Sequence, residues 1–303
     1  MTRRPLAALL WLASCATPPV APAPAPTSAP AASGLAPAAA SSSGATGARP
    51  PVVVALVVDQ FGAWVARERL AELPADGGFA RLRREGTWVV EARHPHAVTD
   101  TAPGHAVLLT GAEPARSGIF GNELPVGNER LSILRDEATR LLGPAGKTDV
   151  VGSSLARLRV PTVADRLRAR HPDAFIASVS LKDRGALFGC GRTPDACLWF
   201  EPGLDAFVTS TAFTTELPAW ARAEAGAEAS ARARATPWTP LDPAWLSAHT
   251  RSPDDQKGEG DWWGLGRVFP HDVAHARKPA TVFRASPVGD ERVLALATAA
   301  ARV

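Results

Sequence analysis

The sequence predicts an α/β fold in which a mostly parallel sheet carries helices on both faces. The first observation is an unbroken apolar run at 51–58, which is typical of a strand buried on both faces and stops at Asp59. The second is that strand-like and helix-like patterns alternate along the chain as far as residue 180. The third is a hydrophobic content of 46% over 303 residues, which supplies ample material for a buried core.

The remaining elements follow in chain order. Helical patterns cover 64–70, 79–82 and 162–167, and strand-like patterns cover 88–92 and 174–180. Thr162 is the expected N-cap of its helix. Ligands of such sheets bind beyond the carboxyl ends of the strands, where the sequence places Asp59 and Lys182.

The second half of the chain has a different character. Residues 215–275 mix tryptophan, proline, alanine and charged residues without a clear period, which predicts an inserted cap or, alternatively, a loop-rich part of the core. A helical pattern then runs from Asp290, its expected N-cap, to Val303. No glycine or proline terminates this helix, so we expect a sheet that is incomplete on the C-terminal side, with an exposed edge.

The beginning of the chain carries a targeting pattern. Two arginines precede a short apolar stretch, and small residues then lead to Cys15. Residues 1–15 resemble a bacterial lipoprotein signal with its lipobox, which makes Cys15 the lipidated residue; an ordinary secretory signal with an incidental cysteine is the alternative. Residues 16–49 are almost entirely Ala, Pro, Ser, Thr and Gly and predict a disordered tether ahead of a folded domain at 50–303. We therefore expect an exported, periplasmic protein held at the membrane by its lipid anchor.

The net charge bears on which partners the protein can bind, and the cysteines bear on whether it contains a disulfide. The formal net charge is only +3 and no cationic block interrupts the sequence, which argues against nucleic acid as a partner. Two further cysteines, Cys190 and Cys197, bracket a short turn and form either a disulfide or two separate thiols. Two cysteines alone do not indicate a zinc site.

A threonine-containing stretch at 97–111 is the first candidate for chemistry. Pro103 is expected at a first helical position and Thr101 about where the N-cap falls, which puts the Thr101 hydroxyl at the positive end of a helix dipole. An anion would bind there, but plain N-capping by Thr101 is the alternative. Thr99 is the competing threonine and is expected to point elsewhere.

Other segments supply complementary groups. Asp59 ends the first predicted strand and Asn122 follows a glycine-flanked turn. Lys182 and Arg184 are two residues apart. A carboxylate for a divalent metal, a hydroxyl to attack, an amide donor and paired cations are the groups that metal-assisted phosphoryl transfer uses. The alternative for Lys182 and Arg184 is that they are solvated surface cations.

Residues 51–303 resemble the N-terminal portion of the PafA-type alkaline phosphatases, within the alkaline phosphatase and nucleotide pyrophosphatase/phosphodiesterase superfamily. The matching motifs, in order along the chain, are Val57-Val58-Asp59-Gln60, Gly77-Gly78-Phe79, Thr99-Asp100-Thr101-Ala102-Pro103-Gly104-His105-Ala106, Thr110-Gly111, Gly118-Ile119-Phe120-Gly121-Asn122, Ser180-Leu181-Lys182-Asp183-Arg184-Gly185-Ala186, Trp199-Phe200-Glu201, Thr209-Ser210-Thr211, Leu217-Pro218-Ala219-Trp220, Phe269-Pro270-His271 and Ser286-Pro287.

This resemblance implies a site with two zinc ions. By position, Thr101 matches the family's nucleophile, which forms a covalent phosphoenzyme and also ligates zinc, and Asp59 matches a ligand of the same zinc ion. Asn122 matches the donor to a phosphoryl oxygen. Lys182 and Arg184 match the pair that contacts the terminal phosphate in monoesterases. The implied activity is the hydrolysis of small phosphate monoesters.

The two cations favour a monoesterase over a phosphodiesterase or nucleotide pyrophosphatase of the same superfamily. A monoester dianion has three free oxygens, whereas a diester has one of them esterified and cannot use both Lys182 and Arg184. The absence of a Cys-x-Pro-x-Arg signature argues against a sulfatase. Asp183 is expected to orient its neighbours, and His105 to pack or hydrogen-bond near the site without binding zinc.

The resemblance assigns only Asp59 and Thr101 as metal ligands, because the family's other zinc ligands lie beyond the equivalent of Val303. His271 and His275 have a spacing that suits metal binding, yet the family counterpart of His271 is not a ligand. Two hypotheses follow. The chain is a truncated phosphatase that hydrolyses p-nitrophenyl phosphate no faster than its Thr101→Ala variant, or it is an inactive exported lipoprotein whose degenerate phosphatase fold binds an anion or a partner.

Overall fold

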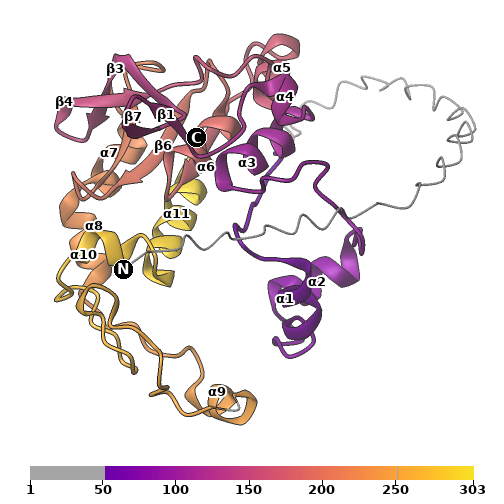
Figure 1. Cartoon of the computed structure of the whole chain (residues 1–303), viewed down its shortest axis with the longest axis vertical. Helices are drawn as coiled ribbons and strands as arrows, with labels where there is room; N and C mark the ends of the chain where they lie inside the picture. The colour runs from indigo at the N-terminus through magenta and orange to yellow at the C-terminus, as the bar shows by residue number, and fades with distance from the viewer. Residues whose placement is uncertain (1–51, 251) are drawn as a thin grey trace, which may run out of the picture. The chain divides into compact units, whose positions relative to one another are not determined.

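The computed structural model describes residues 52–250 and 252–303 (Figure 1). The predicted signal at 1–15, including Cys15, and the predicted tether at 16–49 lie outside the described residues. Within the described part of the chain, no helix is both long enough and apolar enough to cross a membrane.

A five-stranded sheet in the order β4-β3-β7-β6-β5 forms the centre of the fold. Its strands are β3 (Arg135–Gly143), β4 (Gly146–Ser153), β5 (Ala177–Ser180), β6 (Ala196–Glu201) and β7 (Ala206–Ser210). A separate hairpin joins β1 (Glu123–Val126) to β2 (Glu129–Ser132). β5 and β6 are parallel, while the other neighbouring pairs of the large sheet are antiparallel.

The α/β class is confirmed, but the sheet is mixed rather than mostly parallel. Short connections join β3 to β4 and β6 to β7, and strands joined by a short turn pair antiparallel. The sequence does not distinguish β3 and β4 from loops, because both strands carry many charged and polar residues.

The helices, in chain order, are α1 (Ala63–Arg69), α2 (Gly78–Glu85), α3 (Thr101–Thr110), α4 (Pro114–Ser117), α5 (Val163–Arg170), α6 (Asp183–Cys190), α7 (Ala219–Ala225), α8 (Ala227–Arg234), α9 (Pro243–His249), α10 (Pro279–Phe283) and α11 (Pro287–Ala300), with a 3₁₀ turn η1 at Trp262–Gly264. The predicted helical segments fall within or beside α1, α2 and α5. Thr162 caps α5 as predicted: its hydroxyl accepts the Asp165 N–H, and the Asp165 carboxylate accepts the Thr162 N–H.

The last helix begins earlier than predicted. Ser286 is the N-cap of α11 and Pro287 its first residue, so Asp290 lies in the first turn rather than at the cap. Proline is favoured at the first helical position because its fixed φ suits a helix and its missing N–H has no partner there in any case. The carboxylate of Asp290 is still near the positive end of the helix dipole.

Each face of the sheet has its own apolar core, because alternate residues of a strand point to opposite faces. Trp199 on β6 and Val208 on β7 pack in one cluster with residues of α3 and α6. Leu198 and Phe200 on β6 pack in a second cluster with residues of α7, α10 and α11. None of these four side chains is more than 2% exposed. Helices therefore cover both faces, as the sequence predicts.

Two predicted strands do not form. Residues 52–58 and 88–92 pair with no strand of the described fold, and most of their apolar side chains are exposed, Val53 by 91%. An apolar run becomes a buried strand only when a neighbouring strand pairs with its backbone and other elements cover its side chains. Within the described residues the edge strand β5 pairs only with β6, so 52–58 has no such neighbour.

The segment predicted as a cap begins inside the core. Leu217, Ala221 and Ala225, on and just before α7, are buried in the second apolar cluster. The part that follows α8 is more exposed, with Trp262 at 44%. Part of 215–275 is thus buried in the core, and both the inserted cap and the loop-rich core stay predictions for this segment.

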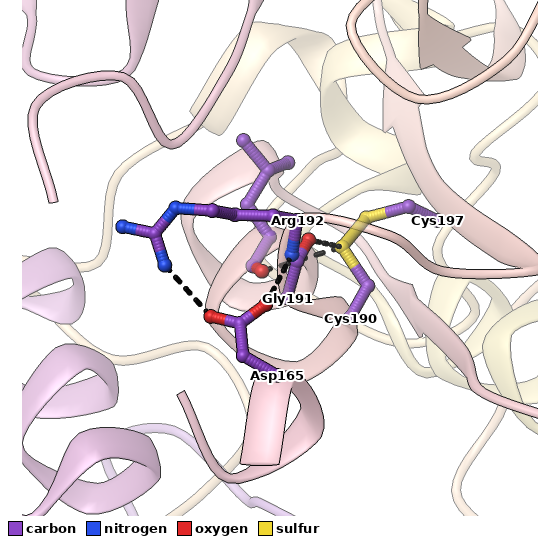
Figure 2. The surroundings of a disulfide bond; sticks show 6 residues. Asp165, Cys190, Gly191, Arg192 and Cys197 are labelled. Atoms are coloured by element: carbon purple, nitrogen blue, oxygen red, sulfur yellow. Dashed lines mark hydrogen bonds and ion pairs between the residues drawn. A yellow bond between two sulfur atoms is a disulfide. The ribbon is translucent and has the colours of Figure 1, made fainter. Parts of the chain in front are cut away.

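Cys190 at the end of α6 and Cys197 in β6 form a disulfide, with Cα atoms 5.7 Å apart (Figure 2). Beside it, Asp165 of α5 accepts hydrogen bonds from the backbone N–H and from Nη1 of Arg192, each at 2.7 Å. Arg192 also donates to the carbonyl oxygen of Leu158 at 2.7 Å. Covalent and ionic links therefore fix the carboxyl end of α6 to β6 and to the start of α5.

Candidate active site

Thr101 is the first residue of α3, and its hydroxyl donates a hydrogen bond to Asp59 Oδ2 at 3.2 Å. Asp100, not Thr101, occupies the N-cap position, and Pro103 lies within the first turn because the helix begins two residues earlier than predicted. The Thr101 side chain is thus engaged with Asp59 instead of capping its own helix. Thr99 precedes the helix and is exposed.

Asp59 lies beside Thr101, as predicted, but in a turn rather than at the end of a paired strand. The next residue, Gln60, has a φ of 62°, in the left-handed region that residues other than glycine seldom adopt. The Asp59 side chain is 41% exposed. Its carboxylate is therefore accessible to a ligand as well as to the Thr101 hydroxyl.

Asn122 is tied to the start of α3. Its Oδ1 accepts the backbone N–H of Ala102 at 2.8 Å, so the acceptor side of the amide is occupied. Nδ2 makes no hydrogen bond to any described residue, and it remains free to donate to a ligand oxygen at the amino end of α3. Ile119, buried in the first apolar cluster, anchors the turn that leads to Asn122.

α6 brings the two predicted cations to the same place. α3 and α6 lie side by side (Figure 1). α6 also lies very close to β5, since a Cβ on Gly189 would be 2.7 Å from Ser178 Oγ and a Cβ on Gly185 would overlap Ser180. Glycines at these two positions let the helix approach the strand, and its amino end with Lys182 and Arg184 is thereby placed beside Thr101.

The two cations have different partners. Lys182 Nζ lies 3.8 Å from Asp59 Oδ2. Arg184 contacts Asp183 Oδ1 at 3.5 Å, but its Nε is buried and has no hydrogen-bond partner in the described structure. Asp183 is held by the hydroxyl of Ser153 at 3.0 Å and accepts the Arg184 backbone N–H at 2.7 Å, which fits the predicted orienting role.

Arg184 Nε is one of five buried side-chain atoms without a hydrogen-bond partner among the described residues, so its burial alone does not mark a ligand site. Two hollows are lined by neighbours of Thr101 rather than by Thr101 itself. One, of about 270 Å³, includes Asn122 and Arg184 in its lining. The other, of about 470 Å³, includes Asp59 and Lys182. The structure therefore brings together all five residues that the sequence singles out: Asp59, Thr101, Asn122, Lys182 and Arg184.

His105 is placed near the same residues by α3. Its Nδ1 lies 2.8 Å from the carbonyl oxygen of Thr101, one turn earlier in the helix. This contact orients the ring along the helix, and it agrees with the predicted packing or hydrogen-bonding role.

Zinc would need more donors than this site shows. Asp59 and Thr101 offer two oxygens, whereas catalytic zinc has at least three protein ligands. Among residues 52–250 and 252–303, no three His, Cys, Asp or Glu side chains are grouped closely enough to hold a metal ion. His271 Nδ1 lies 3.2 Å from the carbonyl oxygen of Leu265. The donors in the described part of the chain do not fit a complete zinc site.

Four residues near Asp59 and Lys182 are not predicted from the sequence. Trp238, Trp262, Arg284 and Asp290 line the larger hollow beside Asp59 and Lys182. Only the concentration of tryptophans in 215–275 indicates a function there, and nothing in the sequence connects these tryptophans to Asp59 or Lys182.

Comparison with known proteins identifies the family of this chain. The family model for type I phosphodiesterase / nucleotide pyrophosphatase matches residues 53–247. The alkaline phosphatase PhoV of Synechococcus elongatus is 31% identical over 84% of this chain and 46% of its own length. The alkaline phosphatase PafA of Elizabethkingia meningoseptica is 32% identical over 83% of this chain and 47% of its own length.

Solved structures give the same result. The crystal structure of wild-type alkaline phosphatase PafA is similar with a TM-score of 0.69 and 28% identity, covering 80% of this chain and 48% of that one. A PafA variant with one threonine, one asparagine, one lysine and one arginine substituted matches with a TM-score of 0.71. The present chain thus spans about half the length of the relatives it matches.

Proposed function

Because the chain belongs to the type I phosphodiesterase / nucleotide pyrophosphatase family, we propose that it binds phosphate monoesters between α3 and α6 and that Thr101 is the nucleophile. The observation that carries this proposal is that Asp59 Oδ2 contacts both the Thr101 hydroxyl, at 3.2 Å, and Lys182 Nζ, at 3.8 Å.

In a site completed by the missing metal ligands, the groups of this chain would act as follows. Thr101 Oγ1 attacks the phosphorus of the ester and a new P–O bond forms. The bond from phosphorus to the leaving-group oxygen breaks, and that oxygen keeps the electron pair and takes a proton from water. The hydroxyl proton moves toward Asp59 Oδ2, to which it already points at 3.2 Å. Water then attacks the phosphothreonine, which releases inorganic phosphate and restores the Thr101 hydroxyl.

Three donors stabilise the transferring group. Asn122 Nδ2 donates to one oxygen, while Arg184 and Lys182 neutralise the charge that builds on the others. A monoester offers all three oxygens to these donors, whereas a diester has an alkyl or aryl group on one of them. Phosphate monoesters are therefore preferred over diesters.

The spacing of the four residues supports this assignment. In the PafA variant whose structure resembles this chain, the substituted threonine and asparagine are separated by as many residues as Thr101 and Asn122 are here. Its substituted lysine and arginine are likewise separated as Lys182 and Arg184 are. A group chosen for joint substitution in a related alkaline phosphatase thus has counterparts in one site of this chain.

Zinc, when bound, would lower the pKa of the threonine hydroxyl and stabilise charge on oxygen. Asp59 and Thr101 each supply one oxygen for it, and the two zinc ions that the family resemblance implies would need ligands that the described residues do not provide. We therefore assign no step to the metal in this chain.

Binding of substrate analogues tests the proposal directly. Isothermal titration with phenyl phosphate and with diphenyl phosphate separates the monoester from the diester. We expect the monoester to bind more tightly, and expect the difference to disappear in the Lys182→Ala/Arg184→Ala double variant. Equal binding of the two compounds to the unmodified chain would overturn the preference for monoesters.

Export and lipid anchoring through Cys15 are part of the same proposal, and they rest on the lipobox pattern alone. Incorporation of labelled palmitate by cells that produce the full chain, and its loss in Cys15→Ala, would support the anchor. Palmitate labelling that persists in Cys15→Ala would contradict it.

A further inference from the structure

The larger hollow beside Asp59 and Lys182 continues away from Thr101 into a part of the chain with no role in the proposed reaction. Its volume is about 470 Å³, within the range of small-molecule sites. Beyond Asp59 and Lys182 its lining includes Trp238, Trp262, Arg284 and Asp290. Asp59 lines this hollow and accepts the Thr101 hydroxyl, so a group bound there lies next to the proposed nucleophile.

The two tryptophans give this hollow flat apolar surfaces. Trp238 is held in place: its backbone N–H and carbonyl oxygen both pair with His271 at 2.9 Å, and its ring meets Phe269 edge-on with centroids 5.4 Å apart. Trp262 is 44% exposed, so much of its ring is available to a ligand. Planar rings stack on such surfaces more favourably than saturated groups of the same size.

The charged residues of the hollow favour a neutral group with polar atoms on its edge. Arg284 and Asp290 make no side-chain hydrogen bond or ion pair with any residue in the described ranges, so one can donate to a ligand and the other can accept. Two cations, Lys182 and Arg284, face two carboxylates, Asp59 and Asp290. This balance disfavours a second phosphate, which would need an excess of positive charge.

We propose that this hollow is the leaving-group subsite, and that it selects phosphate monoesters whose leaving group carries a planar aromatic ring with hydrogen-bonding atoms on its edge. The ring packs against Trp262 and Trp238, and Arg284 and Asp290 bind its polar edge. The inference rests on the proposed function, because it takes the phosphorus to lie between Thr101 and Arg184.

Calorimetric titration of the 303-residue chain with three compounds tests the subsite without any need for turnover. Adenosine 5′-monophosphate carries both the phosphate and the ring, ribose 5-phosphate lacks the ring, and adenosine lacks the phosphate. Stacking of one base on an aromatic side chain changes affinity by about tenfold. We expect adenosine 5′-monophosphate to bind about tenfold more tightly than ribose 5-phosphate.

A pair of matched variants assigns the effect to the hollow. In Trp262→Leu the tenfold advantage should disappear while ribose 5-phosphate binds as before. Trp88→Leu is the control, because Trp88 is 43% exposed, close to the exposure of Trp262, and lies outside the lining. An advantage that survives in Trp262→Leu, or that is lost equally in Trp88→Leu, would overturn the subsite.

The design separates failure of the subsite from failure of the proposed function. If the three compounds show no ring effect but ribose 5-phosphate binding still falls in Arg184→Ala, the phosphate site stands and the subsite is refuted. If adenosine binding depends on Trp262 while Arg184→Ala leaves ribose 5-phosphate unchanged, the phosphate site is refuted, and with it the assignment of the hollow to a leaving group.

Discussion

Two largely apolar runs have opposite environments in this protein. Residues 52–58 are exposed, with Val53 at 91%, whereas β6 is buried, with Phe200 at 1%. β6 has β5 on one side and β7 on the other, while 52–58 pairs with no strand in the described part of the chain. Whether an apolar segment is buried therefore depends on the strands and helices beside it and not on its own sequence alone.

The residues of the candidate site also differ in how well the surrounding structure supports them. Thr101 and Arg184 are on helices packed against the sheet, and the latter helix is also fixed at its far end by the disulfide (Figure 2). Asp59 follows the exposed run and reaches the site through its contacts with Thr101 and Lys182. The donors for phosphate therefore have firmer support than the carboxylate does.

The largest expected difference between the two regions is in stability. Phe200→Ala should lower the free energy of unfolding by about 3–5 kcal/mol, because the ring packs against Phe207 and Phe283 and leaves a cavity when removed. Val54→Ala should change it by less than about 0.5 kcal/mol, since Val54 is 78% exposed. Urea unfolding of both variants measures the two values, and a similar loss in each would show that 52–58 is buried in solution.

The disulfide is the next largest effect. Replacement of both cysteines, Cys190→Ala/Cys197→Ala, should destabilise the fold by about 2 kcal/mol, because the short closed loop limits the entropy of the unfolded chain. Thermal unfolding of the oxidised protein and of the double variant gives the difference. Unfolding at the same temperature would mean that packing alone holds the end of α6 against β6.

Two threonines at helix starts provide a sharper test. Thr162→Ala should cost about 1 kcal/mol, because it removes the side-chain hydrogen bond that caps α5. Thr101→Ala should cost clearly less, because the Thr101 hydroxyl bonds to Asp59 and does not cap α3. The urea midpoints of the two variants measure these losses of stability. An equal loss of stability in Thr101→Ala would indicate that Thr101 caps α3.

The smallest effect is a dependence of stability on pH near the disulfide. Burial raises the pKa of Asp165, but the backbone N–H groups of Arg192 and Thr162 and the charge of Arg192 outweigh it and hold the pKa below the ordinary value of 3.8. A carboxylate with a lowered pKa stabilises the fold above 3.8, and that contribution is lost as the pH falls through the folded-state pKa.

Unfolding midpoints at a pH well above 3.8 and at a pH below it measure this contribution. The unmodified chain should lose more stability between the two conditions than Asp165→Asn does. Glu68→Gln, on the exposed helix α1, is the matched control and should behave like the unmodified chain. Identical pH dependence in all three proteins would contradict a stabilising role for the ionised Asp165.

Local signals in the sequence predict local structure well. The cap at Thr162 is predicted correctly because it depends only on residues within one turn of the helix. The prediction of a strand at 51–58 is wrong because strand pairing depends on distant segments. The prediction of Asp290 as a cap is also wrong, because Pro287 is a stronger signal for the start of a helix and sets the cap at Ser286.

The sequence predicts which residues form the candidate site, but it does not predict how they contact one another. Residue types and family motifs single out Thr101, Asp59 and Arg184. The hydrogen bond from Ala102 to Asn122, and the burial of Arg184 Nε without a partner, arise only when α3 and α6 pack together. The tryptophan-lined hollow is beyond sequence reasoning for the same reason, since its residues come from distant segments.

Titration of inorganic phosphate into the 303-residue chain measures whether Arg184 contributes to a phosphate site. We predict saturable binding that weakens about tenfold or more in Arg184→Ala, because a charged hydrogen bond contributes about 1.5–3 kcal/mol. Arg166→Ala, at an exposed arginine of α5, is the matched control and should bind as the unmodified chain does. Phosphate binding that is absent, or that is equal in Arg184→Ala and Arg166→Ala, would contradict the account.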